Sequence, residues 1–406
     1  MRSLIGLLLI LTISVAAKVS SKNPAMKKRI DAVIDSALRE EKIVGATMIV
    51  AQNRKIVYRR TAGFNDREAK KPLRQTDVFR LASMTKLIVS VAALALIDEG
   101  KLNLDDPVTK YLPEFRPKLT DGREPLITIR HLLTHTAGLH TAGLHTVDQE
   151  QPDGAYHRLK VSDGMNNIGI TLEENLRRIA AAPLLFEPGT ACNYSLATDV
   201  LGAVVAKAGG VSLPEVVKQK VTVPLKMKDT AFFAHNPARL VTPYGDGNPR
   251  PVQMTEPFAL PFGNSQIVYS PRRATDPTAF PSGGAGMVGT IDDYFRLLEV
   301  LRTDGAPILK PETARLIAEN AIGDIPVNTV PNPEAWGWSL GASLLKDPIA
   351  ANTPQSAGTW AWGGIYGHSY FVDPQEKLTV ICLTNTAVAG MTGEFPTALV
   401  NAVYGK

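Results

Sequence analysis

The chain has 406 residues, of which 44% are hydrophobic, and its 44 basic and 39 acidic residues give a formal net charge of +5. Because the two signs are mixed and no basic run exceeds three residues, this charge does not indicate a nucleic-acid-binding protein. The length and the apolar content are sufficient to bury a large hydrophobic core.

The first seventeen residues are typical of a secretory signal peptide. Arg2 supplies a positive start, Leu4 to Ile13 form an apolar run, and Val15-Ala16-Ala17 resembles a cleavage site. The alternative, a membrane anchor, is disfavoured because so short a run does not span a bilayer. The sequence therefore predicts an exported protein, periplasmic or extracellular, without stable membrane insertion after cleavage.

The chain contains two cysteines, Cys192 and Cys382, which lie far apart in the sequence. An oxidising compartment would permit a disulfide between them, and two separate buried thiols are the favoured alternative.

The expected elements suggest an α+β fold. Helical spacing predicts an amphipathic helix over 25–42, and two β-rich runs, 44–51 and 55–61, surround Asn53-Arg54 as in a hairpin. An almost uniformly apolar helix follows up to Gly100. The middle of the chain is expected to be rich in helices and loops, with helices at 172–181 and 199–208 and a proline-dense stretch at 241–281. The C-terminal part is expected to return to strands, at 336–345, 358–372 and 378–385, followed by a closing helix from Phe395.

Strands near both ends of the chain, with helices between them, predict one sheet built from the two termini. We expect a sheet domain from residues 24–100 and 286–406, and a helical domain with long active-site loops over 101–285.

The motif Ser83-Met84-Thr85-Lys86 stands at the head of the apolar helix. A spacing of three places the Ser83 hydroxyl and the Lys86 amine on one face of the helix, and a buried amine can take the proton of the hydroxyl. A second copy, Ser343 to Lys346, lies in a strand-like segment, where residues three apart point to opposite faces. Ser83 is therefore the candidate nucleophile.

Another alternative nucleophile is Ser339, in the G-x-S-x-G pattern Gly337–Gly341, with His368 as a conceivable base. That pattern activates serine at a strand-to-helix turn, whereas this copy sits within a strand-like run. We therefore expect Ser339 and His368 to be structural.

The pentapeptide His135-Thr136-Ala137-Gly138-Leu139 is repeated at once as residues 140–144, which indicates a tandem duplication that lengthens a loop. The resulting cluster of His131, His135, His140 and His145 invites a zinc hypothesis. Spacings of five do not suit one helical face, so no metal site and no cofactor are expected.

Two further segments carry candidate chemistry. Tyr194 lies just before an expected helix, where its phenol could reach a cleft or simply pack. Trp362-Gly363-Gly364-Ile365 lies in a strand-like run, and its glycines either let a ligand approach the backbone or mark a bulge.

Together these motifs resemble the serine β-lactamase and penicillin-binding superfamily, on the class C β-lactamase-like branch and closest to the family VIII carboxylesterases. The resemblance also includes the following segments: Leu104–Pro107, Ile129–Leu139, Glu187–Gly189 before Tyr194-Ser195, and Ser282–Gly286. It implies a β-lactamase/transpeptidase-like fold with an antiparallel sheet flanked by helices. It further implies Ser83 as the acylated nucleophile, Lys86 and Tyr194 as a coupled base and acid, and the backbone N–H groups of Ser83 and Ile365 as the oxyanion hole.

The sequence departs from the lactamases at two places. Tyr194-Ser195-Leu196 stands where they carry Tyr-x-Asn, and Trp362-Gly363-Gly364 stands where they carry Lys-Thr-Gly. The substrate pocket is therefore expected to include Trp362, Gly363, Gly364 and Leu196, with an indole in place of the cation that would hold a carboxylate.

The prediction that follows is an exported serine carboxylesterase that cleaves short or medium acyl esters, with a small-molecule ester as its partner. The alternatives are a transacylase, a weak β-lactamase or D-Ala-D-Ala peptidase, and a cell-wall sensor that is acylated without turnover.

Overall fold

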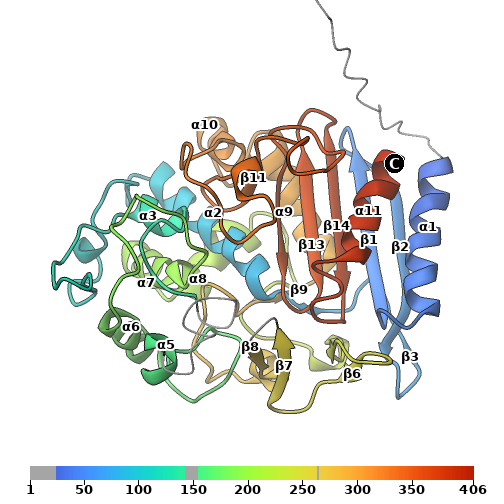
Figure 1. The fold of residues 1–406 in the computed structure, drawn as a ribbon, viewed down its shortest axis with the longest axis horizontal. Helices are drawn as coiled ribbons and strands as arrows, with labels where there is room; N and C mark the ends of the chain where they lie inside the picture. Colours follow the sequence, from blue (N-terminus) through green and yellow to red (C-terminus); the bar gives the residue numbers. More distant parts are fainter. Residues whose placement is uncertain (1–23, 142–153, 263–264) are drawn as a thin grey trace, which may run out of the picture.

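An eight-stranded antiparallel sheet organises the protein (Figure 1). The computed structural model describes residues 24–141, 154–262 and 265–406. The strands follow the order β10-β11-β12-β13-β14-β1-β2-β3. Their bounds are Trp336–Trp338, Ser343–Leu345, Trp360–Gly364, His368–Asp373, Leu378–Thr384, Gly45–Gln52, Lys55–Asp66 and Lys71–Pro72.

The two ends of the chain meet in the middle of this sheet. Strand β1 pairs with β14 from Ala46 opposite Thr384 to Gln52 opposite Leu378. On its other side β1 pairs with β2, and Asn53 and Arg54 at the turn have φ values of 53° and 65°. Those left-handed conformations suit a tight hairpin turn. The predicted hairpin and the predicted sheet from both termini are confirmed.

Two of the predicted C-terminal strands are hairpins. The segment 336–345 turns between β10 and β11, where Ser339 N–H donates to Ala342 O at 2.9 Å. The segment 358–372 turns between β12 and β13, where Gly367 has a φ of 107°. Each segment was expected to be a single strand, and that expectation is wrong because alternating apolar residues do not reveal a short turn.

Helices cover both faces of the sheet (Figure 1). Helices α1 (Pro24–Arg39) and α11 (Glu394–Tyr404) pack against each other and against one face, where Met48, Val380 and Cys382 meet their apolar side chains. Helix α9 (Ile291–Thr303) contacts β14 and β1 from the other face.

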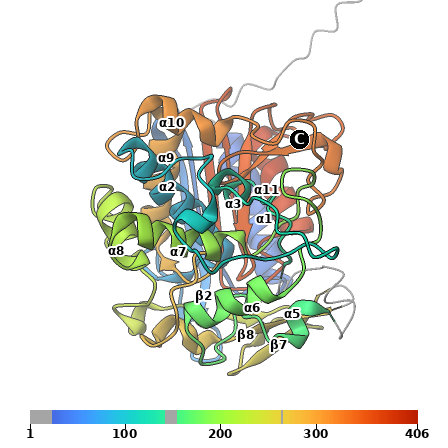
Figure 2. The same cartoon turned by 90° about the vertical axis from the view of Figure 1, so that its left-hand side faces the viewer.

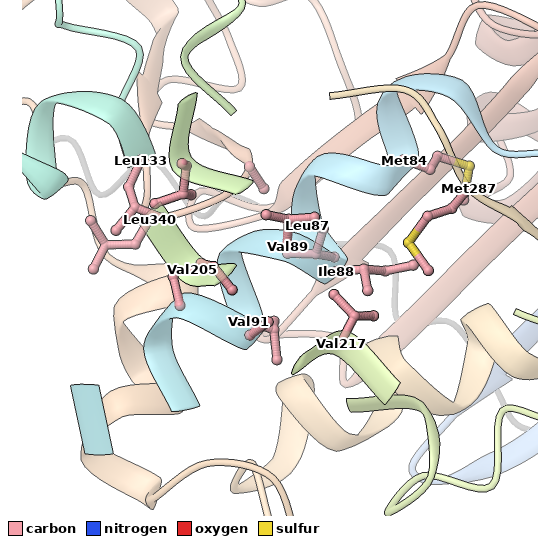
Figure 3. Packing of buried hydrophobic residues seen from close by; sticks show 14 of the residues in the cluster. Met84, Leu87, Ile88, Val89, Val91, Leu133, Val205, Val217, Met287 and Leu340 are labelled. Carbon is pink, nitrogen blue, oxygen red and sulfur yellow. The ribbon is translucent and has the colours of Figure 1, made fainter. Parts of the chain in front are cut away.

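Helix α2 (Thr85–Asp98) is the central helix of the molecule. All of its residues from Thr85 to Leu96 are buried, as its uniformly apolar sequence predicts. Figure 3 shows Leu87, Ile88 and Val91 packed among side chains of neighbouring elements, including Val217 and Met287. The first turn of α2 is thereby held in a fixed place.

The middle of the chain combines short helices with long loops, as expected. Its helices lie on the side of α2 away from the sheet, which is the side that faces the viewer in Figure 2. Its helices are α3 (Ile129–Leu133), α5 (Ala155–Arg158), α6 (Leu172–Ala181), α7 (Ala197–Gly209) and α8 (Leu213–Val217). The proline-dense stretch contains two small antiparallel pairs, β5 (Tyr244–Gly245) with β6 (Val252–Gln253) and β7 (Phe258–Phe262) with β8 (Ser265–Tyr269).

One hydrophobic cluster includes residues of α2, α7, α9 and β13 and so runs through both halves of the chain. The division into a sheet domain and an inserted helical domain stays a prediction. Among the described residues no single helix is long and apolar enough to cross a membrane; α7 and the segment 213–222 pass such a test only as a pair bent by 77°.

Candidate active site

Ser83 lies in a 3₁₀ turn, Ala82–Met84, directly before α2, and not within the helix itself. The preceding strand β4 (Phe79–Arg80) pairs with β9 (Val288–Gly289), and Ala82 has a φ of 45°. A left-handed alanine is a strained conformation that such packing must hold in place. The turn presents Ser83, only 9% exposed, to a cavity.

Lys86 points back to Ser83 from the first turn of α2. Its Nζ lies 3.4 Å from Ser83 Oγ and donates to the carbonyl oxygen of Gly284 at 2.9 Å. The side chain is buried, with 7% of the residue exposed. A Cβ atom at Gly284 would lie 3.3 Å from Nζ, so the glycine leaves room for the amine.

Tyr194 joins this pair from the segment before α7. The Lys86 Nζ lies 4.6 Å from the centre of the Tyr194 ring, and Tyr194 lines the same cavity as Ser83. Trp362 Nε1 donates to the phenolic oxygen of Tyr194 at 3.3 Å. The structure thus brings together Ser83, Lys86, Tyr194 and Trp362.

A buried histidine supports the tyrosine from behind. His135 packs against Tyr194 and Trp338, each with a ring-centre separation of 4.9 Å. Ser195 N–H donates to His135 Nδ1 at 3.1 Å, which assigns an acceptor role to that nitrogen. Burial, and then the Lys86 charge, hold the pKa of His135 well below its usual value. His135 is therefore a neutral acceptor that fixes the segment carrying Tyr194.

Asp199 is a residue of the site that our sequence analysis missed. It lies fully buried on α7, and a Cβ atom at Gly284 would approach its Oδ2 to 2.6 Å. Burial raises the pKa of the Asp199 carboxyl, while the Ser282 hydroxyl and the Lys86 and Arg273 charges act in the opposite direction. An acidic residue within the otherwise apolar helix 197–209 was the signal available in the sequence.

The cavity in front of Ser83 has a volume of about 500 Å³. Trp362, Gly363 and Ile365 line it together with Ser83 and Tyr194. Ile365 is buried, and within the described residues its backbone N–H has no hydrogen-bond acceptor. A buried donor of this kind is available to a substrate oxygen.

Two predicted pocket residues do not line this cavity. Leu196 directly precedes α7 and is buried in the hydrophobic cluster around α2. Gly364 lies against the turn that carries Ser83, where a Cβ atom would be 2.3 Å from Leu81 O. Gly364 thus permits the close approach of strand β12 to the nucleophile turn.

The hydroxyls of the alternative serines are bonded to the backbone, although Ser343 also lines the cavity in front of Ser83. Ser339 is fully buried in the turn between β10 and β11 and exchanges hydrogen bonds with the backbone of Ala342. Ser343 Oγ donates to Ala361 O at 2.6 Å. His368 Nε2 donates to Arg80 O at 2.8 Å. The structure gives all three a structural setting, as expected.

The tandem duplication is described only in part, since residues 142–153 lie outside the described ranges. The second copy was expected to begin a polar loop at the edge of the cleft. His140 is buried and its Nε2 donates to Pro183 O at 2.7 Å, while Thr141 lines the cavity and its hydroxyl donates to Tyr194 O. The start of the second copy therefore lies beside the cavity, and the expectation for the rest of the loop stays a prediction.

Both cysteines are buried and unpaired, which supports the interpretation as separate thiols. Burial raises the pKa of each thiol to about 12. Among the described residues no group of three or more His, Cys, Asp or Glu side chains could hold a metal ion, and His145 lies outside those residues.

Comparison with known proteins agrees with this geometry. The model of the Beta-lactamase family matches residues 30–403. Esterase EstB of Burkholderia gladioli is 48% identical over 385 residues, which cover 94% of this chain and 96% of EstB.

Two solved structures are similar over nearly the whole chain. EstCE1, described as a hydrolase with promiscuous acyltransferase activity, has a TM-score of 0.89 at 42% identity and covers 94% of this chain and 99% of its own. Unliganded simvastatin synthase (LovD) from Aspergillus terreus has a TM-score of 0.71 at 21% identity, with 94% and 98% covered, and shows the shared fold.

The predicted resemblance and the predicted fold class are thereby confirmed. The matched region contains the Ser83 turn, Lys86, Tyr194 and strand β12. The chain is a member of the beta-lactamase family.

Proposed function

We propose that the protein is an exported serine carboxylesterase that cleaves short and medium acyl esters. The observation that carries this proposal is the composition of the cavity in front of Ser83. None of the described residues that line it is charged, and Trp362 occupies the wall where a lactamase would present a cation. A neutral ester fits such a cavity, whereas a carboxylate would lose its solvation without gaining a partner.

The residues around the cavity supply each part of an acyl-transfer reaction. Ser83 Oγ attacks the ester carbonyl, and its proton passes to the Lys86–Tyr194 pair, for which the 3.4 Å contact between Ser83 Oγ and Lys86 Nζ provides the path. The backbone N–H groups of Ser83 and Ile365 stabilise the oxyanion. Tyr194 returns a proton to the leaving alcohol, and water then attacks the acyl-enzyme with the same groups in reverse roles.

The relatives support the reaction class. EstB is named an esterase and EstCE1 a hydrolase. Export is proposed from the N-terminal signal sequence alone.

The test compares one purified preparation on p-nitrophenyl esters and on a chromogenic cephalosporin. We expect kcat/KM for the ester to exceed that for the cephalosporin by about 10² or more, since one charge-assisted contact is missing. Trp362→Lys should lower the ratio of kcat/KM for the ester to kcat/KM for the cephalosporin. Cephalosporin turnover equal to or above ester turnover would overturn the carboxylesterase assignment.

Acyl transfer to an alcohol is a second candidate activity. The cavity is large and largely apolar, and EstCE1 is described as having promiscuous acyltransferase activity. Adding 1-butanol to an ester assay should then yield butyl ester alongside free acid. Formation of free acid alone would exclude this second activity for that acceptor.

A further inference from the structure

The active-site cavity extends behind strand β12, onto the face of the sheet that α11 covers. In the strand register, Gly363 lies opposite Ser369, Ser369 opposite Cys382, and Cys382 opposite Met48. Side chains in register share one face of a sheet. Three of these four residues have small side chains or none, so this row leaves a hollow.

Helix α11 forms the opposite wall of that hollow. Pro396, Leu399 and Val400 of α11 line the same cavity as Cys382 and Met48, and Met391 from the preceding segment joins them. We call this part of the cavity, between α11 and the row from Gly363 to Met48, the rear chamber. Leu399, Cys382 and Met48 are all buried, so much of the wall of the rear chamber is apolar.

The rear chamber reaches Ser83 around the free edge of β12. Of the residues of β12, only Trp360 and Ala361 pair with β11. Within the described part of the chain, the edge of β12 from Trp362 to Gly364 therefore has no neighbouring strand on that side. A Cβ atom at Gly363 would lie 2.5 Å from His368 O and 2.8 Å from Met391 Cγ. The missing side chain at position 363 thus allows Met391 and the His368 carbonyl to pack closely against β12.

From this geometry we infer that the rear chamber binds a linear apolar chain of the ester substrate. The inference rests on the proposed esterase function and adds a place for the chain. A chain that extends from Ser83 into the rear chamber leaves water for the apolar walls formed by Met48, Leu399 and Val400, which line the same cavity as Ser83. Binding is then favoured in proportion to the surface buried. The chain could belong to the acyl group or to the alcohol, and the experiment separates these two sources.

The test measures kcat/KM for p-nitrophenyl octanoate, octyl acetate and p-nitrophenyl acetate in four proteins. Ser369→Leu fills the floor of the rear chamber, and Val400→Trp fills its wall. Thr397→Trp is the matched control, because Thr397 is exposed on the same helix and does not line the cavity. The fourth protein is the wild type.

For one of the two long-chain esters, p-nitrophenyl octanoate or octyl acetate, we expect both chamber variants to lower kcat/KM relative to that for p-nitrophenyl acetate. The ratio should fall at least roughly tenfold, since hydrophobic pockets discriminate chain length on this scale. Thr397→Trp should keep the wild-type ratio. A fall for octanoate assigns the chamber to the acyl chain, and a fall for octyl acetate assigns it to the alcohol. Unchanged ratios for both p-nitrophenyl octanoate and octyl acetate in both variants would overturn the inference. Ser83-dependent hydrolysis of p-nitrophenyl acetate would then show that the proposed function still stands.

Discussion

Trp362 Nε1 donates a hydrogen bond to the phenolic oxygen of Tyr194 at 3.3 Å, and the two rings lie 4.8 Å apart between their centres. The contact links strand β12 to the segment before α7, which are far apart in sequence. Trp362 therefore has two effects. It stands at the position where the lactamases carry a lysine, so the cavity wall has no cation there. It also orients the Tyr194 phenol, which is proposed to donate the leaving-group proton. The contact explains why the tyrosine and the departure at position 362 belong to one site.

The phenolic hydroxyl of Tyr194 is expected to contribute strongly to turnover. Tyr194→Phe removes only that hydroxyl, so kcat should fall by roughly 10²–10⁴ with little change in KM. Trp362→Phe is the companion variant, because it keeps an aromatic wall and removes only the donor to Tyr194; its loss should be smaller. A near-normal kcat in Tyr194→Phe would mean that Tyr194 only packs against its neighbours and has no role in proton transfer.

Ser83 should be the only serine whose removal abolishes ester hydrolysis. Ser83→Ala should be inactive, whereas Ser339→Ala and Ser343→Ala should keep most of the activity, since these two hydroxyls bond the backbone of Ala342 and Ala361. Peptide mapping after treatment with an organophosphonate should identify one adduct, on Ser83. An adduct on Ser339 or Ser343 would contradict the assignment.

Asp199 is expected to act through Lys86. Asp199→Asn keeps the shape of the side chain and removes a charge that faces the amine, so kcat should fall roughly tenfold or more while KM changes little. Asp199→Glu, which retains the charge, should recover part of the loss if the charge matters. Stability is measured by urea unfolding and activity by steady-state kinetics. If Asp199→Asn and Asp199→Glu lose the same stability and the same activity, the role of Asp199 is purely structural.

The duplicated pentapeptide permits a clean deletion. Removal of residues 140–144 joins Leu139 to His145-Thr146, which restores the His-Thr pair that contacts Pro183 and Tyr194 through His140 and Thr141. We expect the shortened protein to fold, because changes in loop length have small free-energy costs, and to differ in chain-length preference. Loss of the cooperative unfolding transition would show that the second copy is required for folding.

His368 should make the protein less stable in acid. Burial lowers its pKa from 6.5 to about 4, so between these values the unfolded chain binds a proton that the folded protein does not. The contribution of His368 to the free energy of unfolding therefore decreases as the pH falls below about 6.5.

The measurement for His368 is a comparison with His368→Gln by urea unfolding at pH 7 and pH 5. The stability advantage of the wild type over the variant should shrink by about 2 kcal/mol between these pH values, because each pH unit contributes about 1.4 kcal/mol. A difference that does not depend on pH would mean that His368 titrates normally in the folded state.

The sequence by itself determined the Ser83-Lys86 pair, the buried helix α2 and the sheet built from both termini. These features depend on short-range spacing and on the period of apolar residues, which a single sequence displays directly. The order of the motifs also indicated the family, which the match over residues 30–403 confirms.

Only the tertiary structure decided which distant residues meet. The Trp362–Tyr194 contact and the approach of Asp199 to Gly284 join segments that lie far apart in the sequence. The row of small residues behind β12 depends on the register of three adjacent strands. The strand register and the packing of α11 create these contacts, and neither leaves a local pattern in the sequence. The two strands that proved to be hairpins show the same limit, because a turn of three or four residues changes the direction of the chain without interrupting its apolar composition.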